Sequence, residues 1–229
     1  MEKLNLSGNY FIQLFNLMNY FPGMGSTLKK IILKRCFIVL IEDGFFSKLY
    51  KLEHLDLSEN ELRSVPPAIR RPSIKELNLS KQCWPLYLCL PLTFELNSDS
   101  FTGMESLRKL DISKTLFNVA ENAFKGAEYL EEVDLSFELL KMIDKKAFFT
   151  NKRLRRLTCH QCWTLEPIHH DMWSSVYNLE ELDLSYSPHS IVPRYLVKYF
   201  YEIYKLLNVL EILKTSTTTQ ERSRFIFQT

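Results

Sequence analysis

The sequence predicts an α/β solenoid, in which short repeats coil around one core and place a parallel sheet along one side. Three observations predict it: a recurring L-x-x-L-x-L pattern, a nearly regular step between its copies, and large rings in register with them. The clearest copy is LEHLDLSENEL at residues 52–62. Leu55 and Leu57 flank Asp56, which predicts a short strand with one buried face, and Asn60 follows where the chain must turn.

The pattern recurs nine times, and its copies begin at Met1, Leu28, Leu52, Ile74, Leu107, Leu130, Leu154, Leu179 and Leu207. The steps between them are 27, 24, 22, 33, 23, 24, 25 and 28 residues, and most lie in the ~20–29 range of such repeats. The longest step predicts a loop insertion in the fourth repeat. The expected strand cores are residues 4–6, 31–33, 55–57, 77–79, 110–112, 133–135, 157–159, 182–184 and 210–212.

Aromatic rings follow the same register. Five rings each stand six residues before the first residue of the next repeat: Phe46, Phe101, Phe124, Phe148 and Trp173. Phe21 stands seven residues before Leu28. Rings at a fixed offset predict a continuous interior column, in which burying each ring contributes roughly 1.5–3 kcal/mol.

With these motifs, residues 1–213 resemble the leucine-rich repeat family, and especially its extracellular subclass of ~24-residue repeats, as in Toll-like receptor ectodomains and adhesion receptors. Repeat six carries the motif best, with Leu130, Val133, Leu135, Leu140, Ile143, Ala147 and Phe148. The resemblance implies a right-handed horseshoe with a parallel sheet on its concave side. It also implies a convex side that is mostly irregular or short-helical.

The position that Asn60 occupies departs from the family pattern. We call it the ladder position, because in this family an Asn there continues a ladder of hydrogen bonds from coil to coil. Only Asn9 matches it, and the other repeats hold Cys36, Gln82, Thr115, Glu138, Cys162, Ser187 and Thr215. We expect the hydrogen-bond ladder of the family to be locally broken, above all at Gln82 and Glu138.

The end of the chain changes character. Residues 194–207 place five apolar side chains on one helical face after Pro193, which predicts a helix. Residues after Leu213 are polar and aperiodic, so we expect a repeat domain at 1–213 and a disordered tail at 214–229. No polar cap is apparent in the sequence, which indicates a fragment of a longer receptor-like protein that could dimerise through uncapped ends.

Composition argues against several classes of partner. The net charge of +2 does not favour nucleic acid, and no apolar run reaches the ~18–20 residues of a membrane span. No cofactor motif is present, and no Gly-rich phosphate loop occurs among six glycines. Cys83 and Cys89 could pair if the protein is secreted, and Asn5 and Asn78 match the N-glycosylation sequon.

Two apparent chemical sites are better explained by the repeat. Cys159 and Cys162, followed by His169 and His170, have zinc-like spacing, but the register puts Cys159 at an inward leucine position and Cys162 at the ladder position. We therefore expect no metal site. The column Asp56, Asp111, Asp134, Asp183 and Glu211 fills a habitual Asp/Asn position of the family, so we expect no catalytic site.

The expected concave face is the better candidate site. Charge pairs alternate over four successive strands as Arg108-Lys109, Glu131-Glu132, Arg155-Arg156 and Glu180-Glu181, which predicts pairing between neighbouring strands. Beside them, Phe137, His160 and Tyr186 are expected at outward positions of strands six to eight. A partner-binding site is therefore predicted at Phe137, His160, Tyr186, Arg155, Arg156, Glu131 and Glu180, with mutual charge satisfaction or loop cover as the simpler alternatives.

The sequence is compatible with two functions of different classes. The first is non-catalytic protein–protein recognition by an extracellular or cell-surface receptor or adhesion protein, with a protein ligand on the concave face. The second is a cytoplasmic scaffold or ubiquitin-ligase substrate adaptor. The Phe column and the ~24-residue steps favour the first, whereas unpaired cysteines and the lack of a signal-peptide pattern favour the second.

Overall fold

The computed structural model describes residues 1–14, 23–82, 94–115, 117–136, 139–140, 142–164, 169–187 and 224–226. Phe21, Cys83, Cys89, Phe137, Glu138, the expected helix at 194–207 and the expected strand at 210–212 lie outside these residues.

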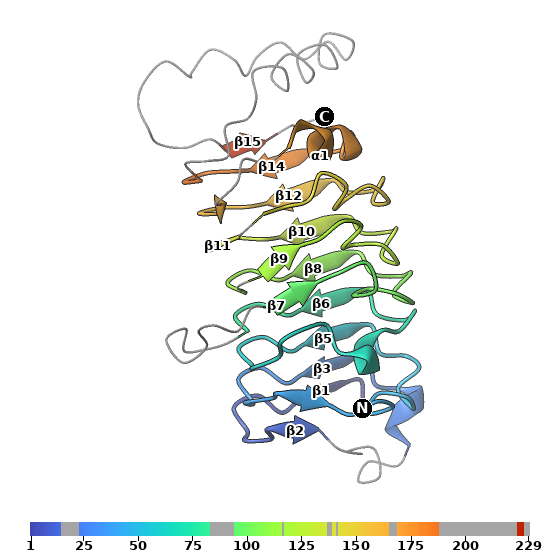
Figure 1. The fold of residues 1–229 in the computed structure, drawn as a ribbon. Coiled ribbons are helices and arrows are strands. Elements are labelled where there is room, and N and C mark those ends of the chain that lie inside the picture. Colours follow the sequence, from blue (N-terminus) through green and yellow to red (C-terminus); the bar gives the residue numbers. More distant parts are fainter. Residues whose placement is uncertain are drawn as a thin grey trace.

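One parallel sheet runs along the solenoid (Figure 1). Its parallel strands pair in chain order and are β1 (Lys3–Asn5), β3 (Lys30–Ile32), β5 (His54–Asp56), β6 (Glu76–Asn78), β8 (Lys109–Asp111), β10 (Glu132–Asp134), β12 (Arg156–Thr158) and β14 (Glu181–Asp183). Each begins one residue before its expected core. The predicted solenoid with a parallel sheet is confirmed.

The ninth strand of this sheet is an antiparallel one. β15 (Arg224–Ile226) pairs with β14, with Phe225 opposite Leu182. These three residues therefore differ from the disorder expected for 214–229, because the outer edge of β14 offers unpaired backbone groups to any extended segment that reaches it. The division into a repeat domain and a tail remains a prediction.

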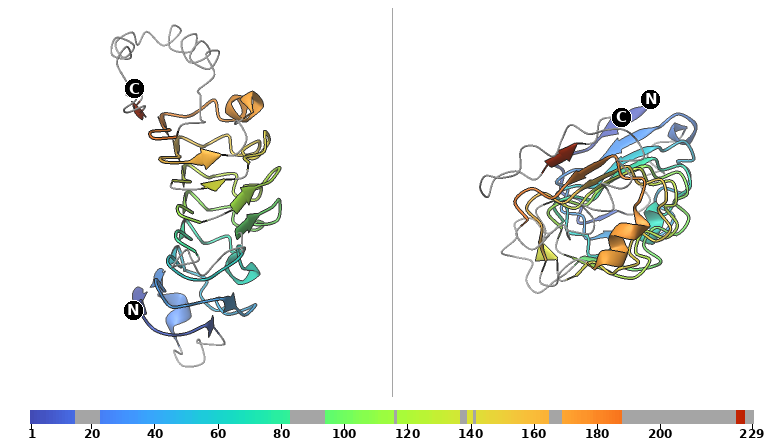
Figure 2. Two further views of the ribbon diagram at one scale, coloured as in Figure 1. Left: turned by 60° about the vertical axis from the view of Figure 1, so that its left-hand side comes forward. Right: turned by 90° about the horizontal axis from the view of Figure 1, so that it is seen from above.

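The side opposite the main sheet is irregular, as expected. It holds the two-stranded pairs β2 (Gln13–Leu14) with β4 (Leu40–Ile41), β7 (Phe94–Leu96) with β9 (Phe117–Val119), and β11 (Leu139–Leu140) with β13 (Trp163–Thr164). The helical turns are η2 (Met24–Ser26), η3 (Pro67–Ile69) and α1 (His170–Ser175). Seen from above, successive coils lie over one another around a common interior (Figure 2).

The aromatic column fills that interior. The rings of Phe101 and Phe124 stack with centroids 5.7 Å apart, and those of Phe124 and Phe148 stack at 4.5 Å. All three are fully buried, and Trp173 continues the series at 2% exposed. The repeat between Phe46 and Phe101 buries Ala68 and Ile69 in place of a ring, so the column is interrupted there.

The ladder is continuous through the position expected to break it. Asn60 donates from Nδ2 to Leu33 O at 2.8 Å, and its Oδ1 accepts from Ile38 N at 3.1 Å. Gln82, only 1% exposed, donates to Leu57 O at 2.8 Å and accepts from Leu62 N at 3.0 Å. The expectation of a break at Gln82 was wrong, because its longer amide reaches the same backbone groups that Asn60 reaches one coil earlier.

The turns that follow the strands carry a charge cluster around the buried Glu59 that was not predicted from the sequence. Glu59, whose side chain is 4% exposed, contacts Arg35 Nη2 at 2.7 Å, Lys81 Nζ at 2.9 Å and Lys34 Nζ at 3.4 Å. Burial raises the pKa of the Glu59 carboxyl, but the hydrogen bonds from Lys81, Arg35 and Lys34 lower it by more, to about 2 from 4.5. The cluster joins three successive coils.

Replacing Phe124 with Ala should lower the free energy of unfolding by about 3–5 kcal/mol, because it empties a buried position between two stacked rings. Denaturant unfolding followed by circular dichroism measures this loss. Phe149→Ala is the matched control, since that neighbouring ring is 54% exposed and its removal should change stability little. Equal losses in the two variants would contradict a buried aromatic column.

Glu59→Gln should lower the free energy of unfolding by about 1–2 kcal/mol at pH 7, less than the full pKa shift implies because its partner cations are partly exposed. A carboxyl with a lowered folded-state pKa stabilises above its unfolded pKa and loses that contribution as pH falls toward the folded value. The difference between wild type and variant should therefore shrink between pH 4.5 and pH 2. Urea unfolding across this range tests it, and a difference independent of pH would contradict the cluster.

Candidate functional site

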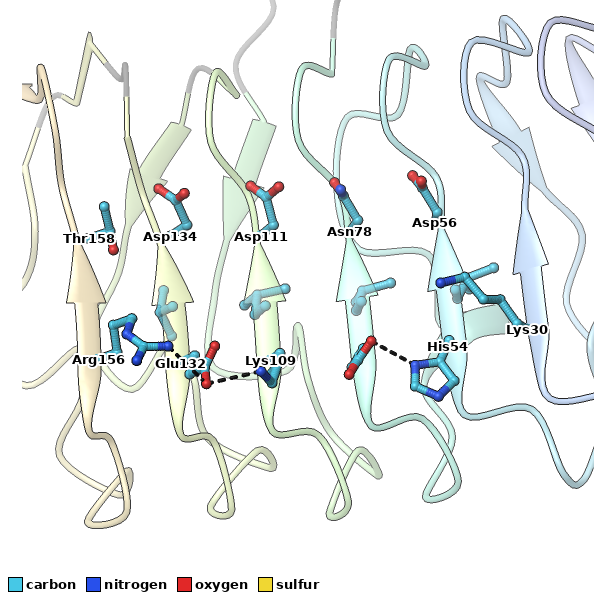
Figure 3. A pocket seen from close by; sticks show the side chains of 15 residues that line it. Lys30, His54, Asp56, Asn78, Lys109, Asp111, Glu132, Asp134, Arg156 and Thr158 are labelled. Atoms are coloured by element: carbon cyan, nitrogen blue, oxygen red, sulfur yellow. Dashed lines mark hydrogen bonds and ion pairs between the residues drawn. The ribbon is translucent and has the colours of Figure 1, made fainter. Parts of the chain in front are cut away.

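The solvent-facing side of the main sheet, which we call the sheet face, carries an open depression of about 390 Å³ (Figure 3). Its lining extends from Lys30 on β3 to Thr158 on β12. Two rows of side chains form it, one from the first residue and one from the third residue of each strand. Because the middle residue of each strand points into the core, these rows are what a partner would meet.

From β8 to β14, the first row and the row just before it pair their charges across neighbouring strands, as predicted. Glu132 on β10 contacts Lys109 on β8 at 3.0 Å and Arg156 on β12 at 3.1 Å (Figure 3). The further pairs are Arg156–Glu181 at 2.6 Å, Arg155–Glu180 at 3.5 Å, and Arg108 with Glu131. Hydrogen bonding to Glu181, opposed by burial and reinforced by Glu132, raises the pKa of Arg156.

Four of the predicted partner-binding residues are therefore engaged within the protein itself. Arg155, Arg156, Glu131 and Glu180 each hold a partner on the adjacent strand. Exposed pairs of this kind contribute only ~0–1 kcal/mol each, so they can exchange partners at low cost when another molecule arrives. Their main effect is to pair opposite charges on neighbouring coils.

The second row explains the habitual Asp/Asn position. Oδ1 of Asp56 accepts from Ser58 N at 2.9 Å, and Asp111 and Asp134 accept from the backbone two residues later in the same way. Asn78 and Asn5, the two sequon residues, make this same turn-closing bond. The side chain at this position thus ends the strand and starts the turn.

The carboxylates of this row are not paired with cations in the part of the chain that the structure describes. Asp56, Asp111, Asp134 and Asp183 have no Lys, Arg or His side chain within ion-pair distance there. Burial raises the pKa of Asp134 against the hydrogen bonds from Ser136, and the Asp111 and Asp183 carboxylates raise it further. Within the described residues, the second row therefore carries unpaired negative charge on β5, β8, β10 and β14, beside the ion pairs of the first row.

His160 and Tyr186, the two predicted ring-bearing residues that the structure describes, lie at one edge of the sheet face. His160 and Tyr186 form an edge-to-face contact with ring centroids 5.2 Å apart, and His160 Nδ1 lies 2.6 Å from Ser185 Oγ. They are not outward residues of strands, as was expected, but lie in the turns directly after β12 and β14. The difference arises because the Asp183 carboxylate closes the turn at Ser185 before Tyr186 is reached.

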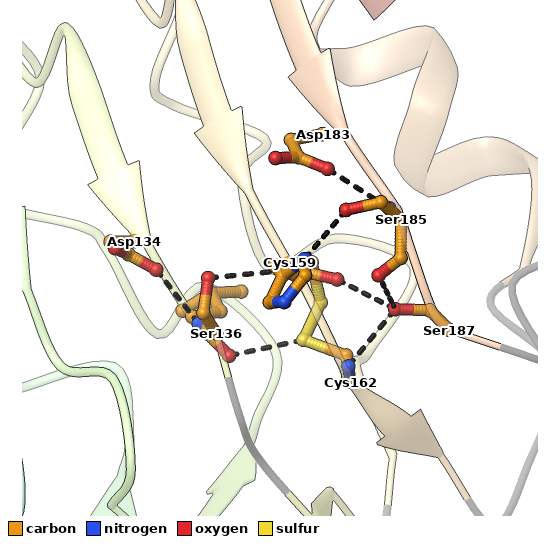
Figure 4. Close-up of a disulfide and its surroundings, with 9 residues drawn as sticks. Asp134, Ser136, Cys159, Cys162, Asp183, Ser185 and Ser187 are labelled. Carbon is orange, nitrogen blue, oxygen red and sulfur yellow. Dashed lines mark hydrogen bonds between the residues drawn. A yellow bond between two sulfur atoms is a disulfide. The ribbon is translucent and has the colours of Figure 1, made fainter. Parts of the chain in front are cut away.

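Cys159 and Cys162 form a disulfide within one turn of the solenoid (Figure 4). Both are 2% exposed, as their inward and ladder positions require, and their Cα atoms are 5.3 Å apart. The bridge was not predicted, because the C-x-x-C spacing of these residues also fits a pair of metal ligands. Among the described residues, no group of three or more His, Cys, Asp or Glu is arranged to hold a metal ion.

The bridge changes the ladder locally. Cys162 Sγ lies 3.0 Å from Leu135 O, where the thiol of Cys36 lies 3.2 Å from Leu6 O in the second repeat. A disulfide sulfur carries no hydrogen, so this contact cannot be a hydrogen bond while the bridge is closed. Ser187 maintains the next step by donating to Cys159 O at 2.7 Å (Figure 4).

Within the described residues, none of the helices has the length and apolar character needed to cross a membrane.

Comparison with known proteins shows which repeat family the sequence matches. A leucine rich repeat model matches residues 26–82, and a model of the BspA type leucine rich repeat region (6 copies) matches residues 94–222. No curated protein sequence matches the chain. Among solved structures, the TLR13–ssRNA13 complex is similar with a TM-score of 0.66 at 24% identity, over 79% of this chain and 24% of that one.

A second similar structure is the octameric complex of Latrophilin 3, Unc5D and FLRT2, in which FLRT2 supplies the leucine-rich repeats. It matches with a TM-score of 0.56 at 19% identity, over 79% of this chain and 60% of that one. This chain therefore spans less than two thirds of either match, and at these identities the similarity shows the fold alone. The family model at 94–222 covers more than half of the chain, and the protein belongs to the leucine-rich repeat family.

Proposed function

We propose that this chain is a non-catalytic recognition module that binds a protein ligand on its sheet face. The observation that carries the proposal is the open depression of about 390 Å³ on a face formed by successive parallel strands. Eight strands spaced ~4.8 Å apart extend roughly 34 Å, which suits a standard interface of about 800 Å² per partner. Leucine-rich repeat domains typically bind proteins through such extended surfaces.

Charge and aromatic content favour a protein ligand over nucleic acid. The cations Lys109, Arg155 and Arg156 already face carboxylates, so little positive charge is left for a phosphate backbone. Tyr186 is 52% exposed and packs edge-to-face on His160 at the edge of the face, and tyrosine is enriched among the residues that dominate interface energies. Phe137, which lies outside the described residues, remains a predicted member of this site.

We further propose that the module belongs to an extracellular receptor or adhesion protein. The Cys159–Cys162 bridge supports this location, because disulfides persist in oxidising compartments and are rare in the cytosol. The two similar structures are a receptor complex with RNA and an assembly of FLRT2 with other proteins, which supports the receptor or adhesion class without identifying a ligand.

The second candidate is an intracellular scaffold or substrate adaptor. Cys36 favours it, since this buried cysteine is free and acts as a thiol donor in the ladder. The same fold and the same sheet face would serve this function, so the compartment distinguishes the two candidates.

Replacing His160 and Tyr186 together with Ala should weaken binding to a protein partner at least tenfold, because hot-spot rings contribute most of the affinity at such interfaces. The partner would be obtained by screening the chain against a panel of receptor ectodomains and measured by surface plasmon resonance. Tyr50→Ala is the control, since that residue is 60% exposed and lies on the turn before β5, away from this edge. Unchanged affinity in a double variant that melts like wild type would rule out this part of the site.

In protein isolated from its natural cells under acid quench, Cys159 and Cys162 should resist alkylation until a reductant is added, whereas Cys36 should be alkylated on denaturation alone. Differential alkylation followed by peptide mass spectrometry measures both. Free thiols at Cys159 and Cys162 would contradict the extracellular assignment and favour the scaffold.

A further inference from the structure

A second surface lies on the turns that enter the strands, on the side of the solenoid where α1 is seen in Figure 1. Three aromatic rings are exposed there on successive coils: Tyr129 at 41%, Phe149 at 54% and Tyr177 at 47%. They precede β10, β12 and β14, whereas His160 and Tyr186 follow their strands. This surface is therefore distinct from the sheet face.

Two cations lie over these rings. Lys152 Nζ is 4.8 Å from the centroid of the Phe149 ring and 5.7 Å from that of Tyr177, so it joins two coils. The guanidinium carbon of Arg153 is 4.0 Å from the centroid of the Tyr129 ring. We call Tyr129, Phe149, Lys152, Arg153 and Tyr177 the rim patch. Cation–π contact orients each cation but leaves its N–H donors available.

In the part of the chain that the structure describes, the cations of the rim patch are not paired with carboxylates, unlike the arginines beside them on the sheet face. Arg155 and Arg156, two and three residues further along, each hold a carboxylate partner. Lys152 and Arg153 have no carboxylate within ion-pair distance among the described residues, in contrast to these neighbours. The nearest acidic residue of the preceding turn, Glu128, accepts a hydrogen bond from Gly126 N.

We propose that the rim patch docks an acidic segment of a partner protein. Carboxylates of that segment would pair with the open N–H groups of Lys152 and Arg153, while its apolar side chains cover the rings of Phe149 and Tyr177. Arginine and tyrosine are enriched among residues that dominate interface energies. This inference goes beyond the ligand proposed for the sheet face and does not depend on it.

Single-stranded nucleic acid fits this surface less well. Such ligands bind by stacking bases on aromatic faces. Here Lys152 lies over the rings of Phe149 and Tyr177, and Arg153 lies over Tyr129, so the protein's own cations compete for these faces. The whole chain carries a net charge of only +2, which provides little of the electrostatic attraction on which backbone binding depends.

The chain provides a matched control at the same repeat positions. Tyr50 stands four residues after the core ring Phe46, as Tyr177 does after Trp173, and Lys51 stands five after Phe46, as Arg153 does after Phe148. Tyr50 is 60% exposed on the turn before β5, which is three places from β10 in the order of the main sheet. Changes at Tyr50 and Lys51 therefore remove the same chemistry from a different place.

The test selects random dodecapeptides on the full immobilised chain and measures each enriched peptide by fluorescence anisotropy. We expect Asp- and Glu-rich peptides with interspersed Leu or Phe. They should lose at least tenfold in affinity on Lys152→Gln/Arg153→Gln, and severalfold on Tyr177→Ala. The control Tyr50→Ala/Lys51→Gln should leave their affinity unchanged. If the double variant melts below wild type, the single variants Lys152→Gln and Arg153→Gln are compared instead.

Three results would overturn the proposal that the rim patch binds an acidic segment. A lack of acidic peptides, or acidic peptides that bind the Lys152→Gln/Arg153→Gln variant as tightly as wild type, would overturn the proposal. So would a single-stranded polyuridine oligonucleotide that binds through the rim patch when acidic peptides do not. The His160→Ala/Tyr186→Ala variant should keep full rim-patch binding, so the two proposed surfaces can fail separately.

Discussion

The solenoid depends on hydrogen bonds between the ladder side chain of one coil and the backbone of the coil before it. Each strand is only three residues long, after which the chain turns inward with its peptide groups cut off from water. Asn60, Gln82 and Thr115 donate to Leu33 O, Leu57 O and Leu79 O, at 2.8, 2.8 and 3.1 Å. An amide of either length or a hydroxyl can therefore fill the position, because each of these side chains places a donor within reach of the same carbonyl.

The outward-facing side chains are not constrained by the ladder. Those along the strands and those on the turns that enter the strands make different contacts. Along the strands, side chains of adjacent coils stand opposite one another, and cations such as Arg156 meet carboxylates at 2.6 and 3.1 Å. On the turns that enter the strands, Lys152 and Arg153 meet aromatic rings instead. Lysine and arginine therefore form ion pairs on the sheet face, whereas they form a positively charged aromatic surface at the rim patch.

Much of this architecture follows from the repeat period. Strand positions, the inward leucines, the column of Phe101, Phe124 and Phe148, and the pairing of Glu132 with Lys109 and Arg156 were all predictable, because each depends on a side chain one repeat away at the same position. The break expected at Gln82 was wrong because the family's preference for Asn says how often that residue occurs at the position. It does not say whether the longer Gln side chain can reach the same backbone groups. The Cys159–Cys162 bridge was missed because its formation depends on the Cα separation of 5.3 Å that the turn creates.

The sequence by itself determined which side chains point inward and which outward, since a coil of fixed length repeats that choice in every turn. Only the tertiary structure decided which outward side chains meet when they occupy different repeat positions. His160 packs diagonally on Tyr186, and Lys152 lies between Phe149 and Tyr177 of neighbouring coils. Such contacts depend on the lateral offset between turns, a three-dimensional quantity that the period of the sequence does not contain.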